Sequence, residues 1–203
     1  MSTLVARAFL LAEEIHATQK RKASIIPNVS YMSHLMEVAG VVMSCGGPDI
    51  AVAAALLHDA IEDQGSSTRA VIGKQLGSDV LALVEECTEP GTGGAVKPPW
   101  RDRKDAALAK MSNASLLALL VLAADKLQNV RDLRRVVTLK GEQVYTFFGA
   151  GKSGICWYHE QFMYITRKRL ILLRTDHPDE PLLPPIQCLL QELREVVTSL
   201  EKG

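Results

Sequence analysis

The sequence predicts an all-α fold, a single helical bundle of about eight to ten helices that spans residues 1–203. Apolar residues recur at spacings of three and four along most of the chain, most regularly over 186–200. No stretch shows the alternation of apolar and polar residues that is typical of a half-buried strand. Clusters of glycine and proline, such as Gly46-Gly47-Pro48, divide the chain into segments of helical length.

The expected helices follow from these patterns and from the breaks between them. They cover residues 3–20, 31–45, 49–63, 67–88 with an interruption at Gly77, 100–110, 114–136, 156–175 and 186–200. Residues 90–99 and 147–154 are rich in glycine or proline and are expected to be loops, the first of them flexible. The apolar stripe of the last helix suits packing on the domain, although it could serve an interface and leaves a homo-oligomer open.

Composition narrows the class of protein. The chain has 47% hydrophobic and 23% charged residues, and its 23 basic and 23 acidic residues cancel, so we expect no nucleic-acid partner. Four cysteines lie far apart without a CxxC pair, which favours free thiols in a reducing compartment. The longest apolar run, over residues 116–124, is shorter than the roughly 20 residues that cross a bilayer, and no signal peptide is evident. We therefore expect a cytoplasmic protein with no membrane partner.

The stretch over residues 53–63 is the centre of the functional prediction. An apolar run leads directly into His58 and Asp59, and Glu62 and Asp63 follow one turn later. Residues four apart share a helical face, so His58 aligns with Glu62 and Asp59 with Asp63. Buried acids need partners, and a metal ion is the simplest partner for this set. The alternative is a core helix that ends in a solvated acidic turn.

Similar polar groups occur on two other predicted apolar helices. His34 and Asp125 each follow an apolar context, and with His58 and Asp59 they make two imidazoles and two carboxylates. This donor set suits Mn²⁺, Fe²⁺ or Zn²⁺, which polarise phosphoryl groups and lower the pKa of bound water. Taken singly, a histidine such as His34 is more often a core or surface residue than a ligand, and Asp125 could be a helix-end acid paired with Lys126.

The ordered set of motifs resembles the HD-domain metal phosphohydrolases, and among them the small alarmone hydrolases, which look like the hydrolase half of the bifunctional stringent-response enzymes. The resemblance is carried by Arg21-Lys22, Tyr31 with His34, His58-Asp59 with Glu62-Asp63, and the run Ala-Asp-Lys-Leu-Gln-Asn-Val-Arg-Asp-Leu at 124–133. These motifs span residues 16 to about 135, and the helices over 155–203 would pack on the domain that they form.

The resemblance implies a Mn²⁺-dependent hydrolase that removes the 3′-pyrophosphate of guanosine tetraphosphate and pentaphosphate. It assigns the metal to His34, His58, Asp59 and Asp125, and the activation of water to Glu62 and Asp63. It assigns contact with the nucleotide substrate to Arg21, Lys22 and Asn129. No synthetase-like region follows, so synthesis of the alarmone is not expected.

The chain departs from the family pattern at several positions. The family often has Pro-Tyr before the first histidine and Pro after it, whereas this chain has Ser30 and Leu35 there. Thr commonly follows the acidic pair, whereas Gln64 follows it here. The segment 147–158 looks like an insertion near the site. Base specificity therefore stays open, and an adenosine analogue is an alternative substrate. The sequence is also compatible with a phosphohydrolase that acts on another nucleotide, and with a nucleotide sensor that binds without turnover.

Overall fold

The computed structural model describes residues 2–22, 24, 26–92 and 98–202. Within these ranges it contains ten α-helices, one 3₁₀ helix and no strand, which confirms the all-α prediction. The elements are α1 (Thr3–His16), α2 (Met32–Ser44), α3 (Asp49–Leu57), α4 (Ala60–Gln64), α5 (Thr68–Leu76), α6 (Ser78–Cys87), α7 (Trp100–Met111), α8 (Leu116–Lys140), η1 (Glu142–Phe147), α9 (Gly151–Asp176) and α10 (Leu183–Lys202).

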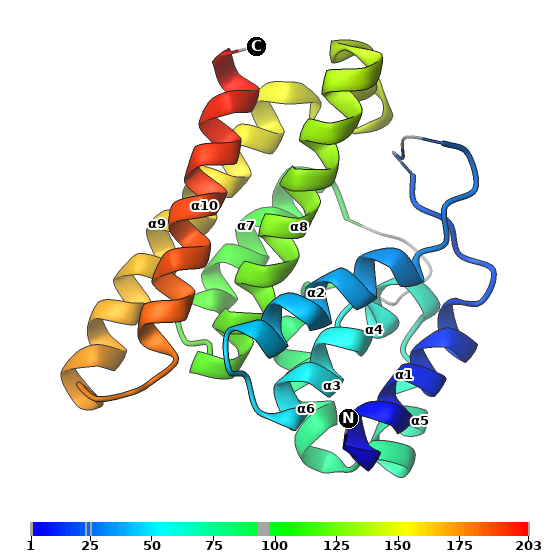
Figure 1. The fold of residues 1–203 in the computed structure, drawn as a ribbon, viewed down its shortest axis with the longest axis vertical. Coiled ribbons are helices and arrows are strands. Elements are labelled where there is room, and N and C mark those ends of the chain that lie inside the picture. The colour runs from blue at the N-terminus through cyan, green and yellow to red at the C-terminus, as the bar shows by residue number, and fades with distance from the viewer. Residues whose placement is uncertain (1, 23, 25, 93–97, 203) are drawn as a thin grey trace.

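Helix α8 is the central element of the bundle. In Figure 1 it rises through the middle of the molecule, with α1–α6 on one side and α9 and α10 on the other. It packs against α2, α3 and α6 and, on its opposite side, against α9 and α10. Its first half is almost wholly buried, which explains the continuous apolar run at 116–124. A polar residue on the next turn of α8 therefore lies inside the protein.

The last two helices cover the other side of α8. Helix α10 contacts both α8 and α9, and eight of its residues are buried at the predicted apolar spacing. Helix α9 begins at Gly151, earlier than the predicted start near 156, because the glycine-bearing segment after Phe148 enters the helix. The buried residues of α10 join the hydrophobic core formed by α1, α2, α3 and α8.

The first and the third predicted helices also differ in their bounds. The first ends at His16 and not near residue 20, because Lys20 pairs with Ser30 in an isolated bridge that turns the chain back toward α2. The third is broken at His58 and Asp59, where Asp59 adopts φ −95° and ψ −3°. The break at Gly77 is confirmed, with φ +97° that favours glycine. Much of the loop predicted at 90–99 lies outside the described residues.

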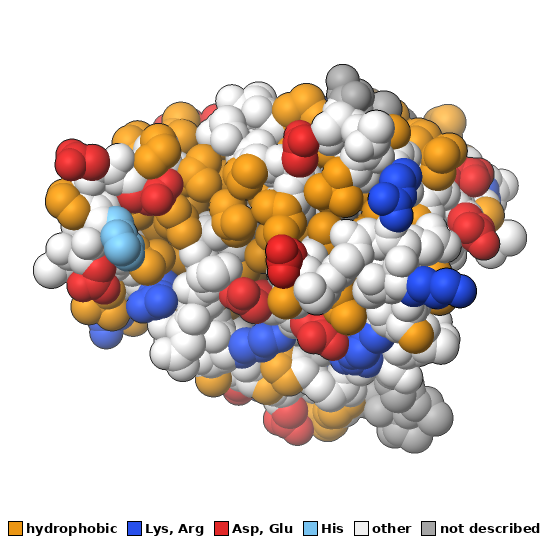
Figure 2. All heavy atoms as spheres, turned by 90° about the horizontal axis from the view of Figure 1, so that it is seen from below, with side chains coloured by type: hydrophobic (Ala, Val, Ile, Leu, Met, Phe, Trp, Pro, Cys, Tyr) orange, Lys and Arg blue, Asp and Glu red, His pale blue; other side chains and the backbone are white. Residues whose placement is uncertain are grey.

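Surface charge is mixed on the face that Figure 2 shows. Acidic and basic side chains are interspersed around a central area of apolar side chains, without a broad region of one sign. None of the helices in the described part of the chain is long and apolar enough to span a bilayer.

Candidate metal centre and active site

Three segments bring the predicted metal ligands together. His34 lies on the first turn of α2, His58 and Asp59 form the turn between α3 and α4, and Asp125 lies in the middle of α8. His34, His58 and Asp125 are each at most 4% exposed. The local break at Asp59 gives its carboxylate a direction that a continuous helix would not.

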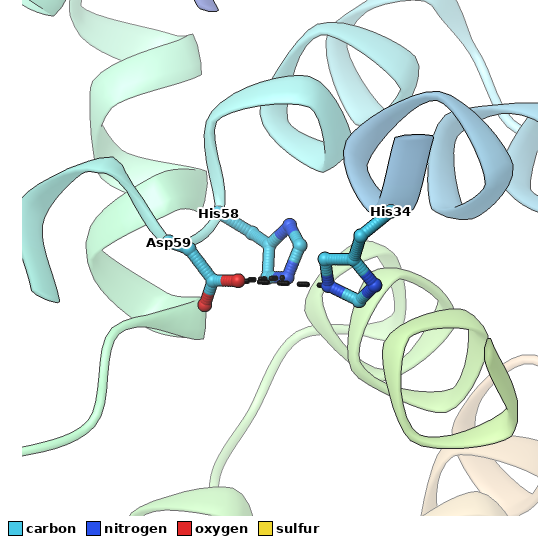
Figure 3. A group of neighbouring side chains, drawn as sticks. All are labelled: His34, His58 and Asp59. Atoms are coloured by element: carbon cyan, nitrogen blue, oxygen red, sulfur yellow. Dashed lines mark ion pairs between the residues drawn. The ribbon is translucent and has the colours of Figure 1, made fainter. Parts of the chain in front are cut away.

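The four side chains meet at one point. Nε2 of His58 is 3.0 Å from Oδ2 of Asp59 and 3.6 Å from Oδ1 of Asp125. Nε2 of His34 is 3.6 Å and 3.3 Å from the same two oxygens. Figure 3 shows both imidazoles pointing toward one Asp59 oxygen, that of His34 from α2 and that of His58 from the turn between α3 and α4. His34, His58 and Asp59 each offer a ligand atom within 4.8 Å of the others.

The tautomers of the two histidines suit a metal ion. Nδ1 of His58 donates to the Ala55 carbonyl at 2.8 Å, a carbonyl at the end of α3, and Nδ1 of His34 donates to Oε1 of Gln128. Nε2 of each ring is then the nitrogen available to a metal, and both Nε2 atoms are buried without a hydrogen-bond partner. Two unpartnered imidazole nitrogens beside two carboxylates are a donor set that fits a divalent cation.

The charges of this cluster balance one another. Burial disfavours charge at Asp59, yet the neighbouring His58 and His34 side chains hold its pKa well below the usual value. Burial opposes charge at Asp125 as well, but Lys126 and the histidines keep its pKa well below the usual value. Both acids are therefore ionised at neutral pH and available as ligands. Tyr31 donates to Oδ2 of Asp59 at 2.5 Å and fixes that carboxylate.

Glu62 lies apart from Asp63 although they are adjacent in the sequence. It lines a small cavity of about 40 Å³ together with His58, Asp59 and Asp125. Burial and the nearby charge of Asp59 raise the pKa of Glu62 to about 7. Such a carboxylate can take a proton near neutral pH, and the cavity is large enough for water.

Asp63 lines a different and larger cavity, which has a volume of about 320 Å³. Gln19 donates to Oδ2 of Asp63 at 2.6 Å and accepts from Nδ1 of His16 at 2.7 Å. His16 in turn stacks on Tyr31, with 5.4 Å between the ring centroids. This network fixes the position of Asp63 at the rim of the cavity.

The predicted substrate residues line the same large cavity. Arg21, Lys22 and Asn129 all lie in its wall. Asn129 donates to Oδ1 of Asp125 at 2.5 Å and accepts from Arg21 at 3.1 Å, and Arg21 also pairs with Asp132 at 3.2 Å. Arg21 and Asn129 are therefore positioned by α8 as well as exposed to a ligand.

Another part of the cavity wall is aromatic and cationic. Trp100 lies edge-on to Tyr158, with 6.4 Å between the ring centroids, and Lys104 lies 4.8 Å from the Tyr158 ring centroid. Lys104, Lys126 and Tyr158 line both cavities, so they form the boundary between them. A phosphate at this boundary would meet two ammonium groups.

Comparison with known proteins agrees with this geometry. The sequence model of the HD domain matches residues 8–156. The chain belongs to the HD-domain family. Guanosine-3′,5′-bis(diphosphate) 3′-pyrophosphohydrolase MESH1 of Xenopus tropicalis is 38% identical over 136 residues, which are 66% of this chain and 72% of that protein. These matches confirm the resemblance to the alarmone hydrolases.

Two further relatives extend the comparison. A probable guanosine-3′,5′-bis(diphosphate) 3′-pyrophosphohydrolase of Synechocystis is 30% identical over 131 residues, which are 64% of this chain and 17% of that much longer protein. The structure of a metazoan SpoT orthologue that hydrolyses ppGpp matches with a TM-score of 0.64 and 25% identity, over 95% of this chain and 96% of that one. The HD-domain fold therefore extends across most of the chain, beyond the sequence motifs.

Several residues of the HD-domain site were not identified from the sequence. Gln128 lies three residues after Asp125 and so shares its helical face, which was a usable signal. Glu89 pairs with Lys104 at 2.9 Å and with Arg103, whose Nη1 is 3.8 Å from Glu62. No sequence pattern links these residues, because they come from opposite ends of the 90–99 segment.

Proposed function

We propose that this HD-domain protein hydrolyses the 3′-pyrophosphate of guanosine tetraphosphate and pentaphosphate, releasing pyrophosphate and GDP or GTP. The observation that supports it best is the convergence of two unpartnered imidazole nitrogens and two carboxylates beside the smaller cavity. Relatives named for this activity include MESH1 of Xenopus tropicalis. In the reaction one water adds to phosphorus, and the bond between phosphorus and the 3′ oxygen breaks.

We assign the metal site to His34, His58, Asp59 and Asp125, and Mn²⁺ as its cation. When bound there, the cation would polarise the phosphoryl group and lower the pKa of water. The protein's contribution is a fixed donor set, because Gln128 and the Ala55 carbonyl orient the two imidazoles.

Glu62 and Asp63 have separate roles in this proposal. Glu62 takes the proton of the attacking water, since its pKa of about 7 matches that task and its cavity has room for water. Asp63 orients the reacting phosphate or water from the larger cavity, held in place by Gln19. The 3′ oxygen of the nucleotide takes up a proton as it leaves.

The nucleotide occupies the 320 Å³ cavity in this proposal. Arg21, Lys22 and Asn129 contact it along one wall, where guanidinium and ammonium groups can bind phosphate and an amide can bind a sugar or base. Lys104 and Lys126 lie where the reacting pyrophosphate would be, and their charges oppose its repulsion by the site's acids.

We also propose that residues 1–203 form a single domain that works in the cytoplasm. The core that includes residues of α1 also includes residues of α10, which supports one folding unit. The four cysteines Cys45, Cys87, Cys156 and Cys188 are free, which suits a reducing compartment.

The test is pyrophosphate release by metal-stripped protein after addition of Mn²⁺. Guanosine and adenosine 3′-pyrophosphates are offered beside nucleoside monophosphates and triphosphates. We expect Mn²⁺-dependent release from a 3′-pyrophosphate, fastest for guanosine, and at least a hundredfold loss in Glu62→Gln and Asp125→Asn.

Asp102→Asn is the matched control, because Asp102 is an exposed acid in the first turn of α7. It should keep wild-type turnover. Release from no 3′-pyrophosphate by a folded protein with Mn²⁺ bound would reject the proposed reaction. Faster release from the adenosine compound would correct the base, and tight binding without product would identify a sensor.

A further inference from the structure

His159 has a hydrogen-bonding requirement that the protein does not meet. Its side chain lies on α9 and is 7% exposed. Nδ1 is 2.8 Å from the Ile155 carbonyl of the same helix, so Nδ1 carries the proton and Nε2 carries a lone pair. Nε2 is buried and has no hydrogen-bond partner. An unsatisfied buried acceptor is costly, and in a native protein it calls for a ligand or water.

The imidazole of His159 faces the substrate cavity. His159 lines the 320 Å³ cavity together with Lys126, Asn129 and Tyr158. Its ring packs edge-on against Tyr158, with 5.6 Å between the centroids, and Tyr158 lines both cavities. The bond to Ile155 turns Nδ1 toward the backbone of α9, and Nε2 lies across the ring from that bond. His159 therefore lies beside the boundary where the reacting phosphate is expected.

The group that His159 can bind is limited by its protonation. Burial lowers its pKa to about 4, and the charges of Lys126 and Lys104 act in the same direction. At neutral pH the ring is uncharged and Nε2 only accepts. Phosphate oxygens are acceptors too, so they cannot be its partner. A hydroxyl or an N–H group of the substrate can.

The position of His159 selects among these donors. When the 3′-phosphoryl group lies at the metal cluster, the nearest donor of the nucleotide is the hydroxyl on the adjacent 2′ carbon. Base N–H groups and the 5′ phosphates are farther along the molecule. We propose that Nε2 of His159 accepts a hydrogen bond from the ribose 2′-hydroxyl, so that the protein selects ribonucleotides over 2′-deoxyribonucleotides. This inference rests on the proposed function, because it assumes that the 3′-phosphoryl group reacts.

The test combines a substrate change with a residue change. Wild type and His159→Phe are compared on guanosine tetraphosphate and its 2′-deoxy analogue, by kcat/KM with Mn²⁺ and by calorimetric affinity without metal. Phenylalanine keeps the ring packed against Tyr158 and removes the acceptor. We expect wild type to favour the ribose compound about five- to tenfold and His159→Phe to show a ratio near one.

A matched control is available on the same helix. Thr166 is fully buried, and its hydroxyl also lacks a partner, but it lies in the wall of neither cavity described above. Thr166→Val removes an unsatisfied polar group from α9 without touching the substrate, so it should keep the wild-type ratio. His159→Phe should also show an unchanged or raised Tm without ligand, because a buried unpaired acceptor has been removed.

The outcomes separate the two levels of the proposal. Equal handling of both compounds by wild type, or a wild-type ratio in His159→Phe, would overturn the role of His159 while hydrolysis itself stands. The same loss of ratio in Thr166→Val would show that repacking of α9 is responsible, and would also overturn it. Failure of wild type to bind or hydrolyse either compound would reject the proposed function and this inference with it.

Discussion

Gln128 provides the sharpest test of how the metal centre is built. Its side chain, 1% exposed, accepts the Nδ1 proton of His34 and donates to Oε2 of Glu37 at 3.3 Å. Gln128→Leu keeps the volume of the side chain and removes the acceptor. The His34 ring then loses the contact that turns Nε2 toward Asp59 and Asp125. We expect weaker metal binding in a protein that remains folded.

The magnitude follows from the structure of the cluster. Loss of an outer hydrogen bond to a metal-binding histidine typically lowers metal affinity by about 10- to 100-fold, or roughly 1.4–2.8 kcal/mol. The smaller value is expected here, because Nδ1 of His58 is held by the backbone carbonyl of Ala55 and is unaffected. The assay is titration with Mn²⁺ while free Mn²⁺ is followed by electron paramagnetic resonance.

Gln191→Leu is the matched control, because it makes the same substitution far from the cluster in sequence. Gln191 is exposed on α10, and its side chain donates to Glu195 of the same helix. The control variant should bind Mn²⁺ as wild type does. A Kd for Gln128→Leu within twofold of wild type, with unchanged circular dichroism, would refute the claim that Gln128 orients His34.

Four further predictions concern the proposed base Glu62, the support of Asp59 by Tyr31 and the hydrophobic core. Activity should fall as pH drops below about 7, because Glu62 must be ionised to accept a proton; a flat kcat/KM profile from pH 6 to 8 would contradict this role. Because its pKa in the fold lies above the ordinary value of 4.5, ionising Glu62 costs stability as pH rises through about 7. Glu62→Gln should therefore melt higher than wild type at pH 8 and show no advantage at pH 4; equal melting at pH 8 would count against it. Tyr31→Phe keeps the stack on His16 and removes the bond to Asp59, so Mn²⁺ affinity should fall about three- to tenfold in the same titration, and an unchanged Kd would exclude support by that hydroxyl. Leu193→Ala, at a fully buried position of α10, should lower the free energy of unfolding by about 2–5 kcal/mol in urea; a loss below 1 kcal/mol would show that α10 is dispensable to the core.

Helical periodicity predicted most of the fold because most helices here bury one continuous face. The apolar spacing of α10 and the glycine break between α5 and α6 were both sufficient signals. The break at Asp59 was not predictable, since residues 53–63 have the pattern of one continuous helix. It depends on side-chain bonds, from His58 to Ala55 and from Tyr31 to Asp59, that exist only in the folded protein.

The metal cluster was more predictable than its surroundings. His34, His58, Asp59 and Asp125 are recognisable because polar residues interrupt apolar helices, and the structure brings all four together. The separation of Glu62 and Asp63 into different cavities depends on the direction of α4, which no local pattern encodes. His159 was not placed from the sequence either, because a single histidine on a helix gives no indication of what its ring faces.

One face of α8 carries both a predicted metal ligand and residues that position a predicted substrate contact. Three polar residues lie three, four and seven positions after Asp125 on α8, namely Gln128, Asn129 and Asp132. Because of this spacing, all four residues form one stripe along the helix. The first of the four belongs to the metal cluster and the second orients His34, while Asn129 and Asp132 hold Arg21 at the cavity wall.

A small rotation of α8 would therefore move a metal ligand and a substrate contact together. Binding of a cation that fixes Asp125 also fixes Asn129 through their 2.5 Å hydrogen bond, and through it the guanidinium of Arg21. Thermodynamic linkage is reciprocal. If the cation raises the affinity for a nucleotide bound by Arg21, the nucleotide raises the affinity for the cation by the same factor. If Asp125 binds the cation and Arg21 the nucleotide, as proposed, their two affinities are coupled through this face of α8.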